Sequence, residues 1–454
     1  ERKPNSVLIF IDDMGYGDPS CYNPESKIPT PNIDDLANHG IMFTDAHSPG
    51  AWCVPSRYGL LTGRYPGRVQ LNWKERSLIE DDQETLATML KRHGYATACI
   101  GKWHLGFDNI NWENPEDMDV LIGGPVDHGF DYYFGLHTSL DIPPYFYTEN
   151  RKVVQAPTDS VVDNQSANAT SAISGAFWRG GKTAPDFKHD AVLDDLTANA
   201  VRFMRQHNDK TPDKPFFLYF PLTAPHTPWL PSGDFRGKSE AGEYGDFVMQ
   251  VDHVVGEIMN TLISLELEDN TLVIFTSDNG PVWFEADIQK YQHDAKNELK
   301  GMKIDLWEGG SRIPFIASWP GNIPEATRSD QLICFTDMMA TFRAMVNDSV
   351  NENKFDSHNF LPVFLNPSVS EPVRNELVIQ ERIYRNGNWK YIDGTGLGGL
   401  SRRFDPNGVY LDEMNNEGEL YNLEEDLYET NNLFKQEGER ANTMKNRLQE
   451  ILEQ

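Results

Sequence analysis

Apolar runs and amphipathic segments alternate along most of the chain. Short runs rich in β-branched and aromatic residues, the composition of buried strands, occur at 6–11, 96–100, 215–220, 271–276 and 313–319. Apolar residues at helical spacing lie between them, around 82–93, 193–203, 247–262 and 337–345. Strands that alternate with helices usually form a mostly parallel sheet flanked by helices. The pattern therefore predicts a large α/β domain, which we place at residues 1–355.

The pattern changes beyond about residue 347. Strand-like segments at 376–380, 387–392 and 419–423 are separated by turns rich in Gly, Asp and Asn, which is typical of a small antiparallel sheet. The last residues, from about 438, have the spacing of a helix. We therefore predict a smaller C-terminal α+β domain at 356–454, with an antiparallel sheet and a closing helix.

Composition and charge narrow the class of protein. Hydrophobic residues make up 39% and charged residues 24% of the 454 positions, as in soluble globular proteins. No apolar run approaches the roughly 20 residues that a membrane-spanning helix needs, so we expect no membrane insertion. The net charge of −29 argues against nucleic acid as a partner, because nucleic acid binds clustered Lys and Arg. An anionic substrate would therefore need positive charge concentrated at its site.

Polar residues directly follow four of the predicted strands. The four groups are Asp12 with Asp13, Lys102 with His104, His226, and Asp278 with Asn279. In a mostly parallel sheet, ligands bind outside the carboxyl ends of the strands. These groups are distant in the sequence, but we expect them to meet at one edge of the sheet.

Oxygen ligands predominate in this set. Asp12, Asp13, Asp278 and the amide carbonyl of Asn279 form a site that suits Ca²⁺, with Mg²⁺ as the alternative. Zinc is disfavoured, because the histidines lack metal-ligand spacing and the four cysteines form no CxxC pair. Positive charge to hold a tetrahedral oxyanion would come from four side chains: Arg57, Lys102, Lys303 and Arg312.

The segment 53–64 has the sequence CVPSRYGLLTGR. Pro55 suits the first turn of a helix, because it lacks an N–H that would be unpaired there. Cys53 should therefore lie at a helix N-terminus, where backbone N–H groups favour an anion. Arg57, one turn further on, can reach back to the same place. The segment resembles the type I sulfatase signature, Cys-x-Pro-Ser-Arg-x-x-Leu-Leu-Thr-Gly-Arg, at every specified position.

The resemblance to sulfatases extends over most of the chain. Further segments similar to those of the family are GKWH at 101–104, PHTP at 225–228, EGGSR at 308–312 and LYNL at 420–423. The resemblance implies an alkaline-phosphatase-like α/β sandwich and the oxidation of Cys53 to formylglycine by a formylglycine-generating enzyme. It also implies a divalent cation held by Asp12, Asp13, Cys53, Asp278 and Asn279.

The same resemblance implies catalytic roles. The hydrated aldehyde at position 53, activated by the metal and by Arg57, would attack sulfur. Lys102 and Lys303 would hold the sulfate oxygens as the charge redistributes. His226 would protonate the departing alcohol, and His104 would take the proton from the second hydroxyl, so that sulfate leaves and the aldehyde returns.

Other functions remain open at this point. Related metal-dependent phosphatases share the fold and the metal ligands, so the chain could hydrolyse phosphate esters, although their nucleophile is Ser or Thr. An arylsulfatase acting on small sulfate esters is a further alternative. A non-catalytic binder of sulfated glycans would keep the pocket without using the nucleophile. Turnover of matched sulfate and phosphate esters distinguishes these functions.

The substrate is predicted from the irregular region 107–189 and from the kind of sulfatase that the chain resembles. Candidates for a sugar-stacking surface are Tyr132, Tyr133, Phe134, His137, Tyr145, Phe146, Tyr147, Trp178 and Arg179, with Trp229 further along the chain. The best resemblance is to bacterial sulfatases of polysaccharides, which implies a sulfated oligosaccharide of an algal or animal glycan, with a galactose- or hexosamine-type sugar. The acidic chain should repel a long polyanion, so we expect recognition of a chain end or a short oligosaccharide.

The compartment is predicted from the start of the chain. Family members that act on glycans are commonly exported, and the sequence begins at Glu1 without a hydrophobic leader. We therefore expect a periplasmic or extracellular protein whose signal peptide has been removed.

Overall fold

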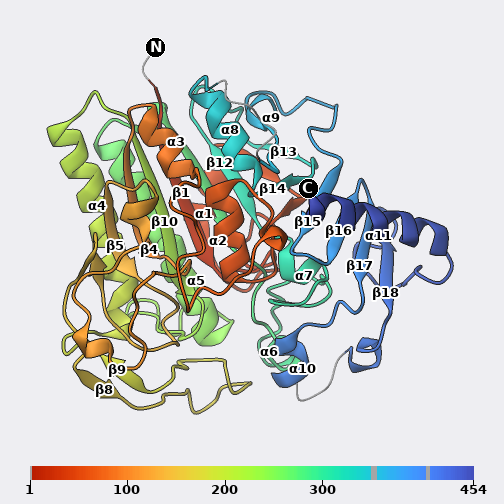
Figure 1. Ribbon diagram of the computed structural model, residues 1–454, viewed down its shortest axis with the longest axis horizontal. Helices are drawn as coiled ribbons and strands as arrows, with labels where there is room; N and C mark the ends of the chain where they lie inside the picture. The colour runs from red at the N-terminus through yellow and green to blue at the C-terminus, as the bar shows by residue number, and fades with distance from the viewer. Residues whose placement is uncertain (1–2, 349–354, 405–409) are drawn as a thin grey trace.

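The computed structural model describes residues 3–348, 355–404 and 410–454. Within these residues, a ten-stranded sheet forms the larger part of the molecule (Figure 1). Its strands, in spatial order, are β13 (Thr327–Ser329), β2 (Ile41–Phe43), β12 (Phe315–Ser318), β11 (Thr271–Ser277), β1 (Asn5–Asp12), β10 (Phe216–Pro225), β4 (Ala96–Lys102), β5 (Tyr132–Leu136), β6 (Thr148–Glu149) and β7 (Lys152–Val153). The neighbours from β11 to β5 pair in parallel, whereas β12 and the β6–β7 hairpin are antiparallel. The predicted mostly parallel sheet is confirmed.

Helices cover both faces of this sheet. They are α2 (Cys53–Thr62), α3 (Leu86–Arg92), α8 (Asp337–Met345) and α9 (Leu361–Leu365) on one face, and α1 (Pro31–Asn38), α4 (Val192–Lys210) and α5 (Gly242–Ser264) on the other. The side chains of β1 alternate between the two faces. Leu8 and Phe10 belong to the hydrophobic core under α2, α3, α8 and α9, whereas Ile9 and Ile11 belong to the core under α1, α4 and α5. Successive side chains of a strand point to opposite faces, so a strand covered on both faces must be apolar at every position. This is why the buried strands appear in the sequence as unbroken apolar runs.

Some elements differ from the prediction. The helix expected from residue 82 begins at Leu86, because Thr85 caps it: the Thr85 hydroxyl accepts a hydrogen bond from the backbone N–H of Thr88 at 3.0 Å. The region 107–189 is not wholly irregular, since it supplies β5 to β7 and the pair β8 (Asp159–Val161) and β9 (Gly181–Thr183). These strands are short or contain glycine, so they lack a clear apolar pattern.

The C-terminal residues form a second sheet, shown in blue at the right of Figure 1. Its antiparallel strands are β15 (Glu376–Ile379), β16 (Ile383–Asn386), β17 (Trp389–Asp393) and β18 (Gly418–Asn422). The closing helix α11 (Gly438–Glu453) packs Met444 and Leu448 against it. The predicted antiparallel sheet and closing helix are confirmed, with β16 as an additional strand. Residues 349–354, next to the predicted domain boundary, and Glu1 lie outside the described residues.

Membrane insertion was not expected from the sequence. Among the helices of the described residues, including α5 with its 23 residues, none is both long and apolar enough to cross a bilayer.

Candidate active site

The carboxyl ends of four neighbouring strands bring the predicted polar residues together. Asp12 ends β1 and Asp13 follows it, while Lys102 ends β4. His226 and Asp278 come directly after β10 and β11. These strands are adjacent in the order β11, β1, β10, β4 and run parallel. The polar groups therefore meet at one edge of the sheet, where all five side chains are buried.

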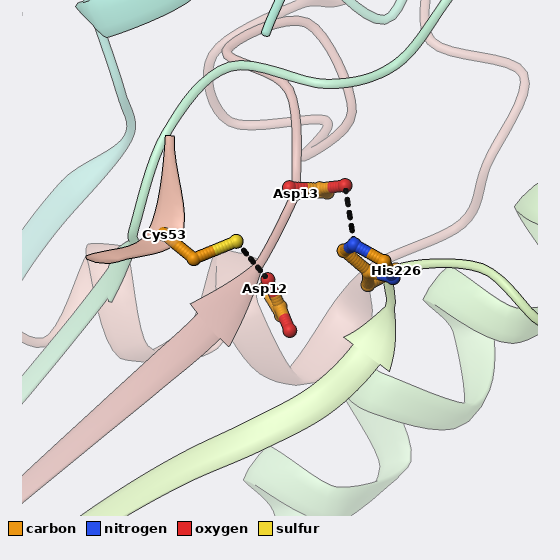
Figure 2. A group of neighbouring side chains, drawn as sticks. All are labelled: Asp12, Asp13, Cys53 and His226. Carbon is orange, nitrogen blue, oxygen red and sulfur yellow. Dashed lines mark hydrogen bonds and ion pairs between the residues drawn. The ribbon is translucent and has the colours of Figure 1, made fainter. Parts of the chain in front are cut away.

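Helix α2 brings Cys53 to the same edge. The helix begins at Cys53, has Pro55 in its first turn, and ends before Gly63, whose left-handed φ of 66° glycine adopts without strain. The Sγ atom of Cys53 lies 3.6 Å from Oδ1 of Asp12 (Figure 2). Burial raises the pKa of the Cys53 thiol to about 12. An unmodified thiol at this position is therefore protonated at neutral pH and is a poor nucleophile.

Each of the three carboxylates has a buried cationic partner. The pairs are Lys102 Nζ with Asp12 Oδ2 at 2.6 Å, Lys303 Nζ with Asp13 Oδ1 at 2.6 Å, and Arg57 Nη2 with Asp278 Oδ2 at 3.0 Å. Arg57 also lies 3.7 Å from Oδ2 of Asp12, the carboxylate whose Oδ1 contacts Cys53 Sγ. These cations place positive charge around the position where an oxyanion would bind.

The carboxylates do not ionise equally. Burial raises the pKa of Asp278 to about 7, and the negative charge of Asp12 acts in the same direction. Burial also opposes ionisation of Asp12, but Lys102 and other cations outweigh it and hold the pKa of Asp12 well below its usual range. The cluster therefore needs further positive charge to keep all its carboxylates ionised near neutral pH.

Donor atoms that could hold a metal ion lie close together at this edge of the sheet. One donor atom from each of four residues lies within 4.8 Å of the others: Asp12, Asp13, Cys53 and His226. Beside them, Asn279 donates a hydrogen bond from Nδ2 to Asp13 at 2.7 Å, while its buried Oδ1 accepts none from the described residues. A buried amide oxygen without a donor, next to carboxylates, is a suitable ligand for Ca²⁺ or Mg²⁺.

Two histidines lie beside this cluster. His226 Nε2 is 3.6 Å from Asp13 Oδ2 (Figure 2). His104 is buried against Trp73, and neither of its ring nitrogens has a hydrogen-bond partner in the part of the chain that the structure describes. Burial, followed by the charges of Lys102 and Arg57, holds the pKa of His104 well below its usual range. The unprotonated imidazole of His104 therefore predominates at neutral pH.

One cation expected at the site lies elsewhere. Arg312 donates from Nε to Glu308 Oε2 at 2.7 Å, and its Nη2 lies 2.8 Å from Asp45 Oδ1. The prediction that Arg312 helps to hold an oxyanion is therefore wrong, because its guanidinium is committed to these two carboxylates.

The predicted sugar-stacking aromatics mostly form the interior of the protein. Tyr133, Tyr145 and Phe146 are fully buried, and Trp229 packs edge-on against Tyr244 with ring centroids 5.2 Å apart. Others stack on neighbouring rings: Tyr132 on Phe203, Phe134 on Tyr147, His137 on Phe146 and Trp178 on His189. A loop region of this size needs its own core, and these rings supply it. The prediction of a stacking surface is wrong for Tyr133, Tyr145 and Phe146, whereas Trp229 lines a cavity that His226 also lines.

A cavity of about 250 Å³ opens beside the cluster. Asp13, His226 and Lys303 line it together with Asp141 and Arg179. The sequence drew attention to Arg179 among the aromatics but not to Asp141. No motif surrounds Asp141, and only the fold shows that it shares a cavity with His226.

Comparison with known proteins identifies the family. The family model described as Sulfatase matches residues 4–347. The chain belongs to the sulfatase family. It is therefore a hydrolase of sulfuric esters, and the predicted resemblance and fold class are confirmed.

Individual sulfatases resemble this chain over most of its length. An N-acetylgalactosamine-6-O-sulfatase of Bacteroides thetaiotaomicron is 33% identical, covering 96% of this chain and 91% of the relative. Human arylsulfatase A is also 33% identical, but the match covers 80% of this chain and 68% of the relative. A solved structure concerning glycosaminoglycan metabolism by Bacteroides thetaiotaomicron has a TM-score of 0.85 and 31% identity, with both chains fully covered.

Proposed function

We propose that this sulfatase removes sulfate from a sulfated carbohydrate, using formylglycine made from Cys53 and a bound Ca²⁺, with Mg²⁺ as the alternative. The observation that carries the proposal is the position of Cys53, whose Sγ lies 3.6 Å from Asp12 Oδ1 in a buried cluster of carboxylates and cations. The relative that matches almost the whole chain is named for a sulfated amino sugar. This match favours a carbohydrate over a small aryl ester.

The side chains around Cys53 have separate roles in this proposal. Lys102 and Lys303, which approach the cluster through Asp12 and Asp13, bind the sulfate oxygens and stabilise charge as it shifts in the transition state. Arg57 stabilises the ionised form of the nucleophile. A divalent cation on the acidic cluster would supply further positive charge to the sulfate group.

Two proton transfers are assigned to the histidines. His226 lines the cavity and donates a proton to the departing alcohol oxygen. His104 has two ring nitrogens without partners among the described residues, and we assign to it the acceptance of a proton when sulfate is released. The buried position of both residues keeps bulk water from competing for these protons.

Modification of Cys53 explains how sulfate is released. The pKa of about 12 leaves the unmodified thiol protonated at neutral pH. A hydrated aldehyde instead offers two hydroxyl groups, one to attack sulfur and one to expel sulfate. A formylglycine-generating enzyme is therefore an expected partner during maturation.

Turnover of matched esters tests this function. We expect protein co-produced with a formylglycine-generating enzyme to hydrolyse sulfated galactose or N-acetylgalactosamine, and nitrophenyl sulfate more efficiently than nitrophenyl phosphate. Faster turnover of the phosphate ester would reject the sulfatase mechanism. Turnover of nitrophenyl sulfate alone, with no activity on a panel of algal and animal sulfated sugars, would reject the carbohydrate substrate.

We further propose that the protein acts in the periplasm or outside the cell, where sulfated glycans are encountered. Fractionation of the native cells, with detection by an antibody, tests this location. Recovery of the protein with the cytoplasmic fraction would contradict it.

A further inference from the structure

We propose that Asp141 and Arg179 form a recognition pair for hydroxyl groups of the sugar that carries the sulfate. The inference rests on the proposed carbohydrate substrate and identifies residues of this chain that would select it. It concerns neutral groups of the sugar, whereas the cluster around Cys53 binds the sulfate.

The fold places the pair beside the reaction site. Asp141 lies in the segment that follows β5, which ends at Leu136. Strand β5 is the parallel neighbour of β4, so its carboxyl end reaches the same edge of the sheet as Lys102. Asp141 and Arg179 line the cavity that His226 also lines. A sugar whose sulfate is bound near Cys53 would therefore extend toward this pair.

The contacts of the pair leave one carboxylate oxygen without a hydrogen-bond partner. Arg179 Nη1 donates to Asp141 Oδ2 at 2.6 Å, and the backbone N–H of Arg179 donates to the Asp141 carbonyl at 3.2 Å. Asp141 Oδ1 has no hydrogen-bond partner within the described ranges, although the residue is only 7% exposed. Buried carboxylate oxygens are rarely left unpaired, so this atom is suited to accept a hydrogen bond from a ligand hydroxyl.

The charge of the pair and the size of the cavity define the ligand further. Because Asp141 pairs with the Arg179 guanidinium, the two together offer an acceptor and donors with little net charge. This combination suits neighbouring sugar hydroxyls better than a second sulfate or a carboxylate. The volume of about 250 Å³ is below the roughly 300–1,000 Å³ of pockets for drug-sized ligands. The cavity therefore fits a single sugar residue.

Kinetics with two substrates test the pair. We would compare Asp141→Asn and Arg179→Gln with the wild type on 6-sulfated N-acetylgalactosamine and on nitrophenyl sulfate. The ratio of kcat/KM for the sugar to kcat/KM for the aryl ester should fall roughly tenfold or more in both variants. Thermal unfolding verifies that each variant is folded.

A matched control is available on the surface. Arg151 is 46% exposed and pairs with Asp127 at 2.6 Å, much as Arg179 is 50% exposed and pairs with Asp141 at 2.6 Å. Arg151→Gln should leave the kinetic ratio unchanged. An unchanged ratio in folded Asp141→Asn and Arg179→Gln would overturn the proposed pair.

Binding of the unsulfated sugar separates this inference from the proposed function. Calorimetry should detect N-acetylgalactosamine binding to the wild type, weakened roughly tenfold or more by Asp141→Asn. No binding by the wild type, or equal binding by both proteins, would overturn the pair even if sulfate esters are hydrolysed. Weakened binding in the variant, with no sulfate ester turnover by matured wild type, would support the pair and reject the proposed function.

Discussion

Two buried clusters contain similar charged residues but differ in the cations that hold their carboxylates and in the side chains beside them. The active-site cluster comprises Asp12, Asp13 and Asp278 with Arg57, Lys102 and Lys303. The inter-sheet cluster comprises Asp45, Glu308 and Glu429 with Arg312, Arg385 and Lys390. Judged only by the distances between donor atoms, described residues at either cluster could hold a metal ion. In the first cluster Asp12 and Asp13 are joined by Cys53 and His226, and in the second His47 joins Asp45 and Glu308.

The inter-sheet cluster is occupied by its own cations. Arg385, on β16, binds Asp45 through two nitrogens at 2.9 and 3.1 Å. Lys390, on β17, donates to Glu308 of α7 (Glu308–Ser311) at 2.9 Å. A metal ion there would have to displace a guanidinium group that holds its carboxylate by two hydrogen bonds. These contacts join the C-terminal sheet to α7 and to the segment that follows β2, so we assign this cluster to stability.

The active-site cluster instead contains Cys53, and its carboxylates lie beside a cavity. Asn279 Oδ1 and both ring nitrogens of His104 are buried without partners among the described residues, and Asp13 and Lys303 face a cavity. Buried atoms without a partner among the described residues also occur in the inter-sheet cluster, at His47 Nδ1 and Arg385 Nε. The clusters therefore differ in the cations that occupy them and in Cys53, whose Sγ lies 3.6 Å from Asp12 in the first. Changes in the first cluster should therefore reduce activity, and changes in the second should reduce stability.

The largest effect is expected from Cys53→Ala. Removing the nucleophile should lower kcat by at least about four orders of magnitude, because the neighbouring groups cannot replace it. The melting temperature should stay close to that of the wild type, since the substitution deletes only one buried sulfur atom. Substantial residual turnover in a well-folded variant would contradict the role of Cys53.

Removal of the metal should have the next largest effect. Treatment with a chelator should abolish activity, and added Ca²⁺ should restore it. Asp278→Ala should weaken Ca²⁺ binding by at least about 100-fold, measured by calorimetry, because one of the clustered carboxylates is lost. Full activity of the metal-free protein would show that the active-site cluster needs no metal ion and is balanced by its own cations, as the inter-sheet cluster is.

Lys390→Met should act on stability rather than catalysis. It leaves Glu308 and Glu429 buried without their shared cation, which should lower the free energy of unfolding by about 3–5 kcal/mol. Urea unfolding measures this loss. The kcat of the protein that remains folded should change little, and a large fall in kcat at unchanged stability would reverse the assignment of the two clusters.

The smallest effect concerns the pH dependence of stability. Burial raises the pKa of Glu429 to about 7, although Lys390 opposes the shift. The Glu429 carboxyl group therefore binds its proton more tightly in the folded protein than in the unfolded chain. The stabilisation of the folded state by this proton is complete below pH 4.5 and is lost as the pH rises through 7. The loss should be at most about 3 kcal/mol.

Glu429→Gln tests this pH dependence. The variant should lack this part of the pH dependence in urea unfolding between pH 4.5 and 8, because glutamine does not titrate. Identical pH profiles of stability for variant and wild type would contradict a raised pKa of Glu429.

The sequence predicted the parts of the fold and the site that depend on local pattern. The unbroken apolar run of β1 requires a sheet covered on both faces, and its end places Asp12 at the sheet edge. The sequence also placed Cys53 at a helix N-terminus through Pro55. These features depend on residues close together in the chain, which is why pattern alone identified them.

The errors and omissions concern contacts between distant segments. Arg312 lies near Lys303 in the sequence, but Asp45, from a distant segment, binds its guanidinium together with the neighbouring Glu308. Asp141 has no motif, and only tertiary structure brings it into a cavity with His226. Burial of Tyr133 and Phe146 likewise depends on how the loops fold back on themselves. Hydrophobic periodicity carries no information about such partners.

The central claim is that Cys53 is the precursor of the nucleophile, and the mass of the peptide that contains residue 53 tests it most directly. Active protein, co-produced with a formylglycine-generating enzyme, should yield a peptide lighter than the encoded cysteine peptide. That peptide should also react with a carbonyl reagent. An intact Cys53 thiol in fully active protein would contradict the mechanism.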